Sequence, residues 1–338
     1  MICIADIGGM METKNATVVV TGASSGLGRA VAHAFARQGA HVVLAARHKR
    51  ELEHAAQECR AFGATAIPVA TDVTNEAAVK RLGQAALDAL GTIDVWVNNA
   101  AVTYFAPLEE GDMAEHRAIL DTNVIGYIHG ARTALPVFKD QGRGVLINVS
   151  SVLGVVGHPY VQSYVISKFA DRGLSEALRA SLADYPDIHV STILPFSIDT
   201  PHFLVADNIL GKLPIPIPPL QSPEKVANAI VDITRRPRHQ RYVPRYIQAG
   251  VLLKHLFPTI TDRMLLHTLQ RFHFAGPMKK QVGSALRPGK IRGTVHGEEG
   301  PAASMPRVLA FAARDAGLTT WRSGVRRMRR RWQPQREA

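Results

Sequence analysis

Short runs of β-branched residues alternate with longer amphipathic segments through the first 195 residues of the chain. This alternation predicts a parallel sheet, because parallel neighbours need a crossover connection, which is usually a helix. Six such runs predict an α/β fold with a doubly wound sheet. The strands are expected at Thr17 to Thr21, His41 to Ala45, Thr65 to Val69, Ile93 to Val97, Gly144 to Val149 and His189 to Leu194.

Apolar residues at three- and four-residue spacing mark the helices that cover this sheet. They are expected at Leu27 to Gln38, Lys49 to Phe62, Glu76 to Leu90, Met113 to Phe138 and Gln162 to Asp184. Ser222 followed by Pro223 predicts the start of a further helix, which runs to about Arg235. A short last strand is expected near Arg241 to Val243, and Tyr246 to Phe274 is again amphipathic.

A glycine-rich turn joins the first expected strand to the first expected helix. It reads Thr21-Gly22-Ala23-Ser24-Ser25-Gly26-Leu27-Gly28. Glycines let the backbone turn sharply and approach a pyrophosphate, whose charge is met by free N–H groups and by the positive end of the helix. A plain loop is the alternative, but the place between a strand and a helix favours a dinucleotide site.

The spacing of these glycines, TGxxxGxG, differs from the GxGxxG fingerprint and resembles the form found in the short-chain dehydrogenase/reductase family. Asp72-Val73 resembles the pair that holds the adenine ring in that family. Asn98-Asn99-Ala100-Ala101 resembles its NNAG motif, with Ala101 in place of the glycine. The resemblance covers roughly Thr17 to Thr200. It implies a Rossmann-like single domain that moves a hydride between a nicotinamide cofactor and a CH–OH group.

Asn123, Ser151, Tyr164 and Lys168 complete the family's catalytic set. Tyr164 and Lys168 are four residues apart on an expected helix, so they lie on one face. The pKa of a phenol is about 10, and a lysine cation together with oxidised nicotinamide would lower that pKa. Tyr164 could then act as acid or base near neutral pH. An ordinary helix face is the alternative for an isolated Tyr-x-x-x-Lys pair, and the accompanying motifs argue against it.

Ser151 lies 13 residues before Tyr164, which is the separation that the family uses. Its hydroxyl can donate to the substrate oxygen, and Ser150 is the competing assignment. By resemblance, Lys168 also bonds the nicotinamide ribose, and Asn123 holds a water that links the lysine to solvent. A capping or kink asparagine is the alternative for Asn123. The chemistry needs neither a metal nor a covalent intermediate, and the sequence shows no clustered metal ligands.

The end of the second expected strand predicts which nicotinamide cofactor binds. The segment Leu44 to Arg47 offers no acid for the ribose hydroxyls, and Arg47 can pair with a 2′-phosphate through its guanidinium. A solvated surface arginine is the alternative. We therefore expect NADP(H) in preference to NAD(H). The expected cofactor contacts are Gly22, Ser24, Ser25, Gly26, Leu27, Gly28, Arg47, Asp72, Val73, Asn99, Ala100, Tyr164, Lys168 and Thr200.

The sequence departs from the family pattern after the sixth expected strand. The family commonly has Pro-Gly there, whereas this chain has Pro195-Phe196, with Thr200 still available to contact the nicotinamide. Segments 153–161 and 196–220 are rich in apolar residues, which suit a small hydrophobic carbonyl or alcohol, although such residues are as often plain packing. The expected substrate contacts are Ser151, Leu153, Tyr160 and Phe196.

The chain divides into four expected segments. They are a flexible N-terminus (1–13), a catalytic domain (14–245), an amphipathic helical extension (246–276) and a basic, partly disordered tail (277–338). Residues 279–338 hold 14 Lys and Arg against 4 Asp and Glu, so they carry +10 of the net charge of +12. A solvated tail, contact with an anionic membrane surface and nucleic-acid binding are the alternatives, and nucleic acid is the least favoured.

The remaining features predict a cytoplasmic protein. Cys3 and Cys59 lack the spacing of a metal site, and the first residues lack the pattern of a secretory signal. Lys254 interrupts the best apolar stretch, so no transmembrane helix is expected, while peripheral membrane association through the tail stays open. We also expect a homo-oligomer.

Taken together, these features predict an NADP(H)-dependent oxidoreductase that interconverts a carbonyl and an alcohol. The first rival is a catalytically silent regulatory protein that senses the cofactor. The second is a membrane-surface scaffold that acts through the basic tail. Intact Ser151, Tyr164 and Lys168 argue against both rivals.

Overall fold

A computed structural model describes residues 11–281, 286 and 293–297 of the chain. Most of the basic tail therefore lies outside the described residues. Within the described part, no helix has the length and apolar character needed to cross a bilayer. The described chain begins with firm contacts, since the Met11 N–H donates to the Arg235 carbonyl oxygen and Thr13 is buried.

Seven parallel strands form the central sheet in the order β10-β7-β6-β4-β1-β2-β3. The strand β1 is buried along its whole length, and Val18 pairs with Val42 of β2 and with Val95 of β4. The strands span Thr17–Thr21 (β1), His41–Ala46 (β2), Ala66–Ala70 (β3), Val95–Asn98 (β4), Gly144–Val149 (β6), Ile188–Pro195 (β7) and Gln240–Val243 (β10). The predicted doubly wound sheet is confirmed.

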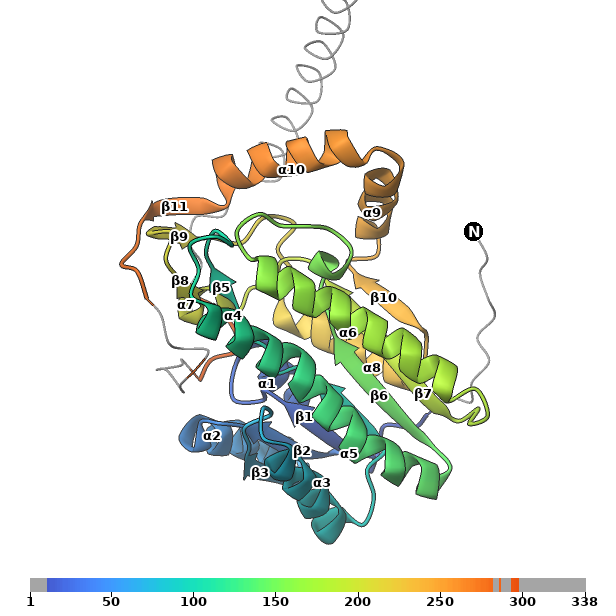
Figure 1. The fold of residues 1–338 in the computed structure, drawn as a ribbon. Helices are drawn as coiled ribbons and strands as arrows, with labels where there is room; N and C mark the ends of the chain where they lie inside the picture. Colours follow the sequence, from blue (N-terminus) through green and yellow to red (C-terminus); the bar gives the residue numbers. More distant parts are fainter. Residues whose placement is uncertain (1–10, 282–285, 287–292, 298–338) are drawn as a thin grey trace, which may run out of the picture.

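Helices cover both faces of the sheet (Figure 1). Helices α1 (Gly26–Ala36), α2 (Lys49–Ala61) and α8 (Pro223–Arg235) pack on one face, where apolar residues of α1 and α8 meet β1 and β2. Helices α3 (Glu76–Leu90), α5 (Gly126–Gln141) and α6 (Gln162–Ser181) cover the other face around Trp96 and Phe138. Every residue of α1 is buried, so this helix is held from several sides.

One predicted helix is broken in the structure. The run from Met113 to Phe138 was expected to be continuous, but α4 (Met113–Leu120) leads into a π-helical turn at Asp121–Ile125 before α5 begins. In that turn the Asn123 amide accepts from the Val102 N–H at 2.8 Å and donates to the Val102 carbonyl oxygen at 3.0 Å. Side-chain spacing alone carries no signal for such a turn, because it depends on a partner distant in sequence.

The amphipathic extension forms two helices at the carboxyl ends of the strands (Figure 1). Helix α9 (Ile247–Leu256) ends before α10 (Pro258–Phe272), because Pro258 has no N–H to continue the first helix. The inner side of α10 places Leu265 and Leu269 in a cleft above the sheet. Short elements complete this region: α7 (His202–Val205), β5 (Tyr104–Phe105), β8 (Asp207–Asn208), β9 (Lys212–Pro214) and β11 (Phe274–Pro277).

The outer side of α9 leaves large apolar side chains exposed. Leu252, Leu256 and Phe257 are 61%, 63% and 51% exposed. The expected contact between this extension and an anionic membrane stays a prediction, because most of the basic tail that would share it lies outside the described residues.

Two helical glycines give a matched test of the cofactor turn. A Cβ on Gly28 would lie 2.2 Å from the Gly22 carbonyl oxygen, whereas a Cβ on Gly173 of α6 meets no heavy atom within 4 Å. We expect Gly28→Ala to lower the free energy of unfolding by at least about 2 kcal/mol, because backbone atoms cannot yield. Gly173→Ala should raise it by roughly 0.5–1 kcal/mol. Urea denaturation of both variants measures the difference, and equal effects would contradict the close approach at Gly28.

Candidate active site

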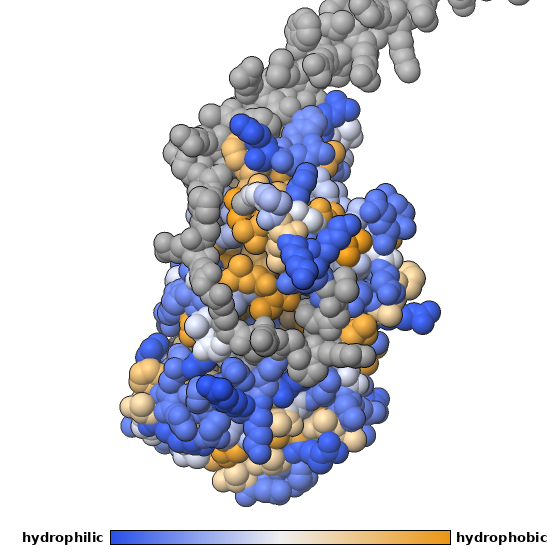
Figure 2. Space-filling view, turned by 90° about the vertical axis from the view of Figure 1, so that its left-hand side faces the viewer, coloured by the Kyte–Doolittle hydropathy of each residue, from blue (hydrophilic) through white to orange (hydrophobic). Residues whose placement is uncertain are grey.

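A cleft of about 690 Å³ opens at the carboxyl ends of the central strands. All fourteen residues expected to contact the cofactor line it, together with Ser151, Leu153 and Phe196. Part of its lining shows as an apolar hollow in the space-filling view (Figure 2). Two expected residues are not in the lining: Asn123 is fully buried beside it, and the Tyr160 ring packs against Phe274 with 5.1 Å between ring centroids.

The turn between β1 and α1 has the geometry that a dinucleotide needs. Gly22 has a φ of +69°, a backbone conformation that residues other than glycine rarely adopt. The turn that it forms places the start of α1 at the cleft. The first turn of α1 contains no acidic residue, and the Ser25 side chain makes no capping bond to the helix. The positive end of α1 therefore faces the cleft without a competing carboxylate.

Strand β4 is tied to this turn by Asn99. Its side-chain amide donates to the Thr21 carbonyl oxygen at 2.9 Å, while its backbone N–H donates to the Thr21 hydroxyl at 2.9 Å. Arg47 follows β2 and lines the same end of the cleft. Asp72 is exposed there, and its carboxylate accepts from the Thr74 N–H and hydroxyl. These residues fit the adenosine half of a nicotinamide dinucleotide.

Residues 293–297 of the C-terminal part also contact this turn. The Gly26 N–H donates to the Thr294 carbonyl oxygen at 2.8 Å. His296 lies 3.2 Å from the Asp199 carboxylate and 2.9 Å from the Glu224 carboxylate. The described piece therefore joins the start of α1 to the loop after β7 and to the start of α8.

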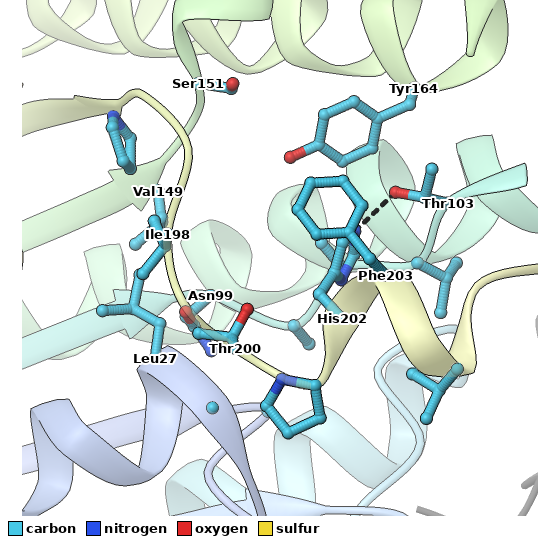
Figure 3. Close-up of a pocket in the computed structure, with 18 of the residues that line it drawn as sticks. Leu27, Asn99, Thr103, Val149, Ser151, Tyr164, Ile198, Thr200, His202 and Phe203 are labelled. Atoms are coloured by element: carbon cyan, nitrogen blue, oxygen red, sulfur yellow. Dashed lines mark hydrogen bonds between the residues drawn. The ribbon is translucent and has the colours of Figure 1, made fainter. Parts of the chain in front are cut away.

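Tyr164 and Lys168 lie one turn apart on α6, as their spacing predicted. The Tyr164 hydroxyl points into the cleft on the side of Ser151, while Asn99 and Thr200 lie toward the cofactor turn (Figure 3). The Lys168 ammonium is 5.5 Å from the centroid of the Tyr164 ring. It donates to the Val149 carbonyl oxygen at 2.9 Å, to the Asp171 carboxylate at 2.9 Å and to the Tyr127 hydroxyl at 3.4 Å.

The surroundings of Tyr164 and Lys168 raise the pKa of both groups. Burial raises the pKa of Tyr164 above its ordinary value, and the Lys168 ammonium opposes that rise without cancelling it. Burial alone would lower the pKa of Lys168, but the Asp171 carboxylate together with the Tyr127 and Tyr164 hydroxyls outweighs it, so the net pKa is raised and the lysine is protonated. We expected Lys168 and oxidised nicotinamide together to lower the pKa of Tyr164. The net shift among the protein's own groups is upward.

The two neighbouring serines have different surroundings. The Ser150 hydroxyl is buried and donates to the Lys168 carbonyl oxygen at 2.8 Å. Ser151 is partly exposed, its hydroxyl oxygen accepts from the Leu153 N–H at 3.1 Å, and it begins the short helical turn Val152–Gly154. Its hydroxyl proton can donate toward the Tyr164 hydroxyl and the cleft, and this hydrogen bond acts to lower the pKa of Tyr164. The geometry therefore favours Ser151 over Ser150 as the residue beside a substrate oxygen.

Asn123 lies behind α6 rather than in the cleft. Its amide donates to the Ser167 hydroxyl at 3.0 Å, and Ser167 donates to the Tyr164 carbonyl oxygen at 2.7 Å. Together with the two bonds to Val102, these contacts favour the kink asparagine that was the alternative expectation. A role in holding water for Lys168 stays a prediction.

The sequence reasoning missed four polar residues near Tyr164. Asp171 and Tyr127 bind Lys168, and His202 lies beside Tyr164 with 5.9 Å between ring centroids. The His202 imidazole shares a hydrogen bond of 2.6 Å with the Thr103 hydroxyl (Figure 3). Burial and the Lys168 charge lower the pKa of His202 to about 4, so it is neutral at pH 7. Helical spacing from Lys168 could have indicated Asp171, whereas the others come from distant segments.

Comparison with known proteins agrees with this geometry. Residues 16–207 match the family described as short chain dehydrogenase. The chain is 32% identical over 329 residues to the uncharacterized oxidoreductase YxnA of Bacillus subtilis, with 94% of this chain and 92% of that protein covered.

Two solved structures are similar to this chain at 27% identity each. A short-chain dehydrogenase/reductase from Burkholderia phymatum in complex with NAD has a TM-score of 0.67, with 81% of this chain and 100% of the other covered. An alcohol dehydrogenase from Thermococcus sibiricus complexed with 5-hydroxy-NADP has a TM-score of 0.60, with 67% and 95% covered. Both neighbours bind a nicotinamide cofactor, and they differ in which one.

The buried pair of Lys168 and Asp171 can be tested by its effect on stability. We expect Asp171→Ala to lower the free energy of unfolding by about 3–5 kcal/mol, because it leaves a buried ammonium without its counter-ion. The control is Glu53→Ala, which removes an exposed pair with Arg60 and should cost less than about 1 kcal/mol. Urea denaturation compares the two variants. A similar small loss in both would show that Lys168 does not need Asp171.

Proposed function

Because this chain belongs to the short-chain dehydrogenase family, we propose that it interconverts a carbonyl and an alcohol with NADP(H), using Tyr164 as the general acid/base. The family makes it an oxidoreductase that acts on CH–OH groups with a nicotinamide cofactor. The observation that carries the finer proposal is the meeting of Tyr164, Ser151 and the cofactor turn in one cleft.

The residues of the cleft suit each part of the cofactor. The β1–α1 turn would hold the pyrophosphate, with the Gly26 N–H exchanging its bond to the Thr294 carbonyl oxygen for one to a phosphate oxygen. Asp72 and Val73 would hold the adenine, and Arg47 a 2′-phosphate. Thr200 and Lys168 would hold the nicotinamide end. The bound nicotinamide supplies or accepts the hydride at its C4 atom. No acid stands in the segment 44–47, so this segment itself offers no carboxylate to repel a phosphate.

The proton step belongs to Tyr164 and Ser151. In carbonyl reduction, the carbonyl carbon gains a hydride and its oxygen becomes negative. The Ser151 hydroxyl donates a hydrogen bond to that oxygen, and the Tyr164 hydroxyl transfers its proton to it, leaving a phenolate. The Lys168 ammonium, which lies 5.5 Å from the centroid of the Tyr164 ring, stabilises the phenolate through its charge.

The Lys168 contacts support a second role in binding. The bond to the Tyr127 hydroxyl is 3.4 Å long, compared with 2.9 Å for its other two bonds. It is therefore the contact that Lys168 would give up most easily to a ribose hydroxyl. The bonds to Val149 and Asp171 would keep the ammonium in place during that exchange.

The substrate is proposed to be apolar. Beyond Ser151 and Tyr164 the cleft is lined mainly by apolar and aromatic side chains. They come from the loop after β6, from β5, from α7 and from the inner side of α10, and include Leu153, Phe105, Phe203, Leu265 and Leu269. Such a surface suits a hydrophobic ketone, aldehyde or alcohol. Phe196 lines the cleft and packs among Val152, Leu194 and Tyr242, so its ring is part of that wall.

A homo-oligomer is also proposed. Helices α4 to α6 expose Met113, Ile166 and Phe169 at 61%, 53% and 45%. Large apolar side chains on neighbouring helices are typical of an interface between chains. Size-exclusion chromatography with light scattering would measure the number of chains in the assembly.

Replacing the proposed acid/base tests the mechanism. We expect Tyr164→Phe to lower kcat for NADPH-dependent carbonyl reduction by at least about 100-fold, because the ring keeps its packing and loses its proton. Binding of NADPH, followed by its fluorescence, should persist. The control is Tyr185→Phe on the protein surface, which should keep full activity. Retained turnover in Tyr164→Phe would refute the assignment, and absence of turnover in the unmodified protein would favour the cofactor-sensing rival.

The cofactor preference is tested by reversing one charge. We expect Arg47→Asp to shift the ratio of kcat/KM for NADPH to that for NADH at least about tenfold toward NADH, because a carboxylate repels the 2′-phosphate. The exposed Arg50 offers the control, since Arg50→Asp makes the same charge change outside the cleft lining. An equal shift of the NADPH-to-NADH ratio in both variants would mean that Arg47 does not bind the 2′-phosphate.

A further inference from the structure

Two imidazoles lie on the aromatic wall of the cleft and have no part in the proton step. His158 precedes α6 and His273 follows α10, and both line the cleft. Their ring centroids are 5.1 Å apart, at an interplanar angle of 73°. Phe105 and Phe203 surround His273, with centroid distances of 5.8 and 6.1 Å. A polar pair in such a wall is costly unless it binds a polar partner.

The hydrogen bonds of His273 fix its tautomer. Its Nδ1 lies 2.8 Å from the Ile215 carbonyl oxygen, and that oxygen can only accept. Nδ1 therefore carries the hydrogen, and Nε2 of the neutral ring is an acceptor. The Ile215 N–H donates in turn to the His273 carbonyl oxygen at 2.9 Å, so the loop after β9 and the end of α10 hold the ring between them.

His158 has the opposite tautomer. The Tyr160 N–H donates to His158 Nδ1 at 3.3 Å, so Nδ1 is the acceptor and Nε2 carries the hydrogen. Among the described residues, Nε2 of neither imidazole has a hydrogen-bond partner in the protein. The pair therefore carries one acceptor and one donor without a protein partner, on neighbouring rings that line the cleft.

Neither imidazole carries a charge near neutral pH. Burial, together with a smaller contribution from His273, lowers the pKa of His158 to about 3. Burial also lowers the pKa of His273 to about 4. A carboxylate or phosphate would find no positive charge here and would be costly to bury. A hydroxyl group both donates and accepts, so it matches the pair.

The pair is separated from the reacting hydroxyl by a row of rings. Tyr164 contacts His202 at 5.9 Å, His202 contacts Phe203 at 5.9 Å, and Phe203 contacts His273 at 6.1 Å, all between centroids. Leu265 and Leu269 of α10 line the cleft as well. A ligand that reaches both ends needs an apolar body with a polar group at each end.

We propose that His158 and His273 form a recognition site for an uncharged hydroxyl group at the end of the substrate remote from the reacting carbonyl. The substrate class is then an extended apolar ketone, or the corresponding alcohol, with a second hydroxyl. This inference rests on the proposed function, because its ligand is the substrate of that reaction. The C-terminal extension supplies the acceptor, so it takes part in substrate choice.

The test uses saturated fused-ring ketones in pairs, with and without a hydroxyl on the ring remote from the carbonyl. The pairs differ in the number of fused rings, and each is assayed with the full chain and NADPH. In at least one pair, we expect kcat/KM to be about 10- to 100-fold higher for the hydroxyketone than for the ketone without the hydroxyl, mainly through a lower KM. His273→Asn keeps a donor for the Ile215 carbonyl oxygen but removes the acceptor at Nε2. This variant should bring the ratio of kcat/KM between the two members of a pair close to one.

Two further variants complete the test. His158→Asn keeps an acceptor for the Tyr160 N–H and removes the donor, so it should lower the ratio as well. His255→Asn changes an exposed histidine of α9 outside the cleft lining and should keep the ratio of the unmodified protein.

The outcomes separate this inference from the proposed function. If the unmodified protein reduces both members of every pair equally, or if His273→Asn and His158→Asn keep its preference, the hydroxyl site is overturned while the proposed reduction stands. If it reduces no ketone of either kind with NADPH, the proposed function fails and the hydroxyl site fails with it.

Discussion

The buried ammonium of Lys168 is the constraint on which the arrangement of the site depends. A cation inside a protein must be compensated by nearby oxygens, and here Val149, Asp171 and Tyr127 supply them. Because Val149 ends β6 and Asp171 belongs to α6, the same ion joins strand and helix. Tyr164 is one helical turn away and Ser151 follows the same strand, so the lysine positions both sides of the proposed proton step.

Those parts of the fold that depend on local patterns could be predicted from the sequence. The central strands are buried on both faces and therefore appear as continuous β-branched runs, such as Thr17 to Thr21. The start of α8 was predicted at Ser222 and Pro223, and the Ser222 hydroxyl accepts from the Lys225 N–H there. The Tyr164 and Lys168 pair was predicted for the same reason, because one helix carries both residues.

Features that depend on distant contacts could not be predicted. In the π-helical turn at Asp121–Ile125, Asn123 binds the backbone of Val102, and no spacing encodes that partner. Likewise, Tyr246 to Phe274 was expected to be helical from its periodicity alone, which indicates an apolar side without indicating what covers it or where α9 ends and α10 begins. In the structure the apolar side of α10 lines the cleft, and His273, which is bonded to the Ile215 carbonyl oxygen, belongs to its aromatic wall.

The balance of charges around Tyr164 has a consequence for the direction of the proposed reaction. Family resemblance suggested a phenol made more acidic, but burial outweighs Lys168 because that ammonium is shared with Asp171. The protein's own groups therefore keep the proton on Tyr164 at neutral pH, and His202 beside it adds no positive charge. A protonated phenol is ready to donate to a carbonyl oxygen, whereas accepting a proton requires further positive charge in the cleft. The oxidised nicotinamide carries such a charge, so in the proposed mechanism the alcohol-to-carbonyl direction would depend on the cofactor more than its reverse would.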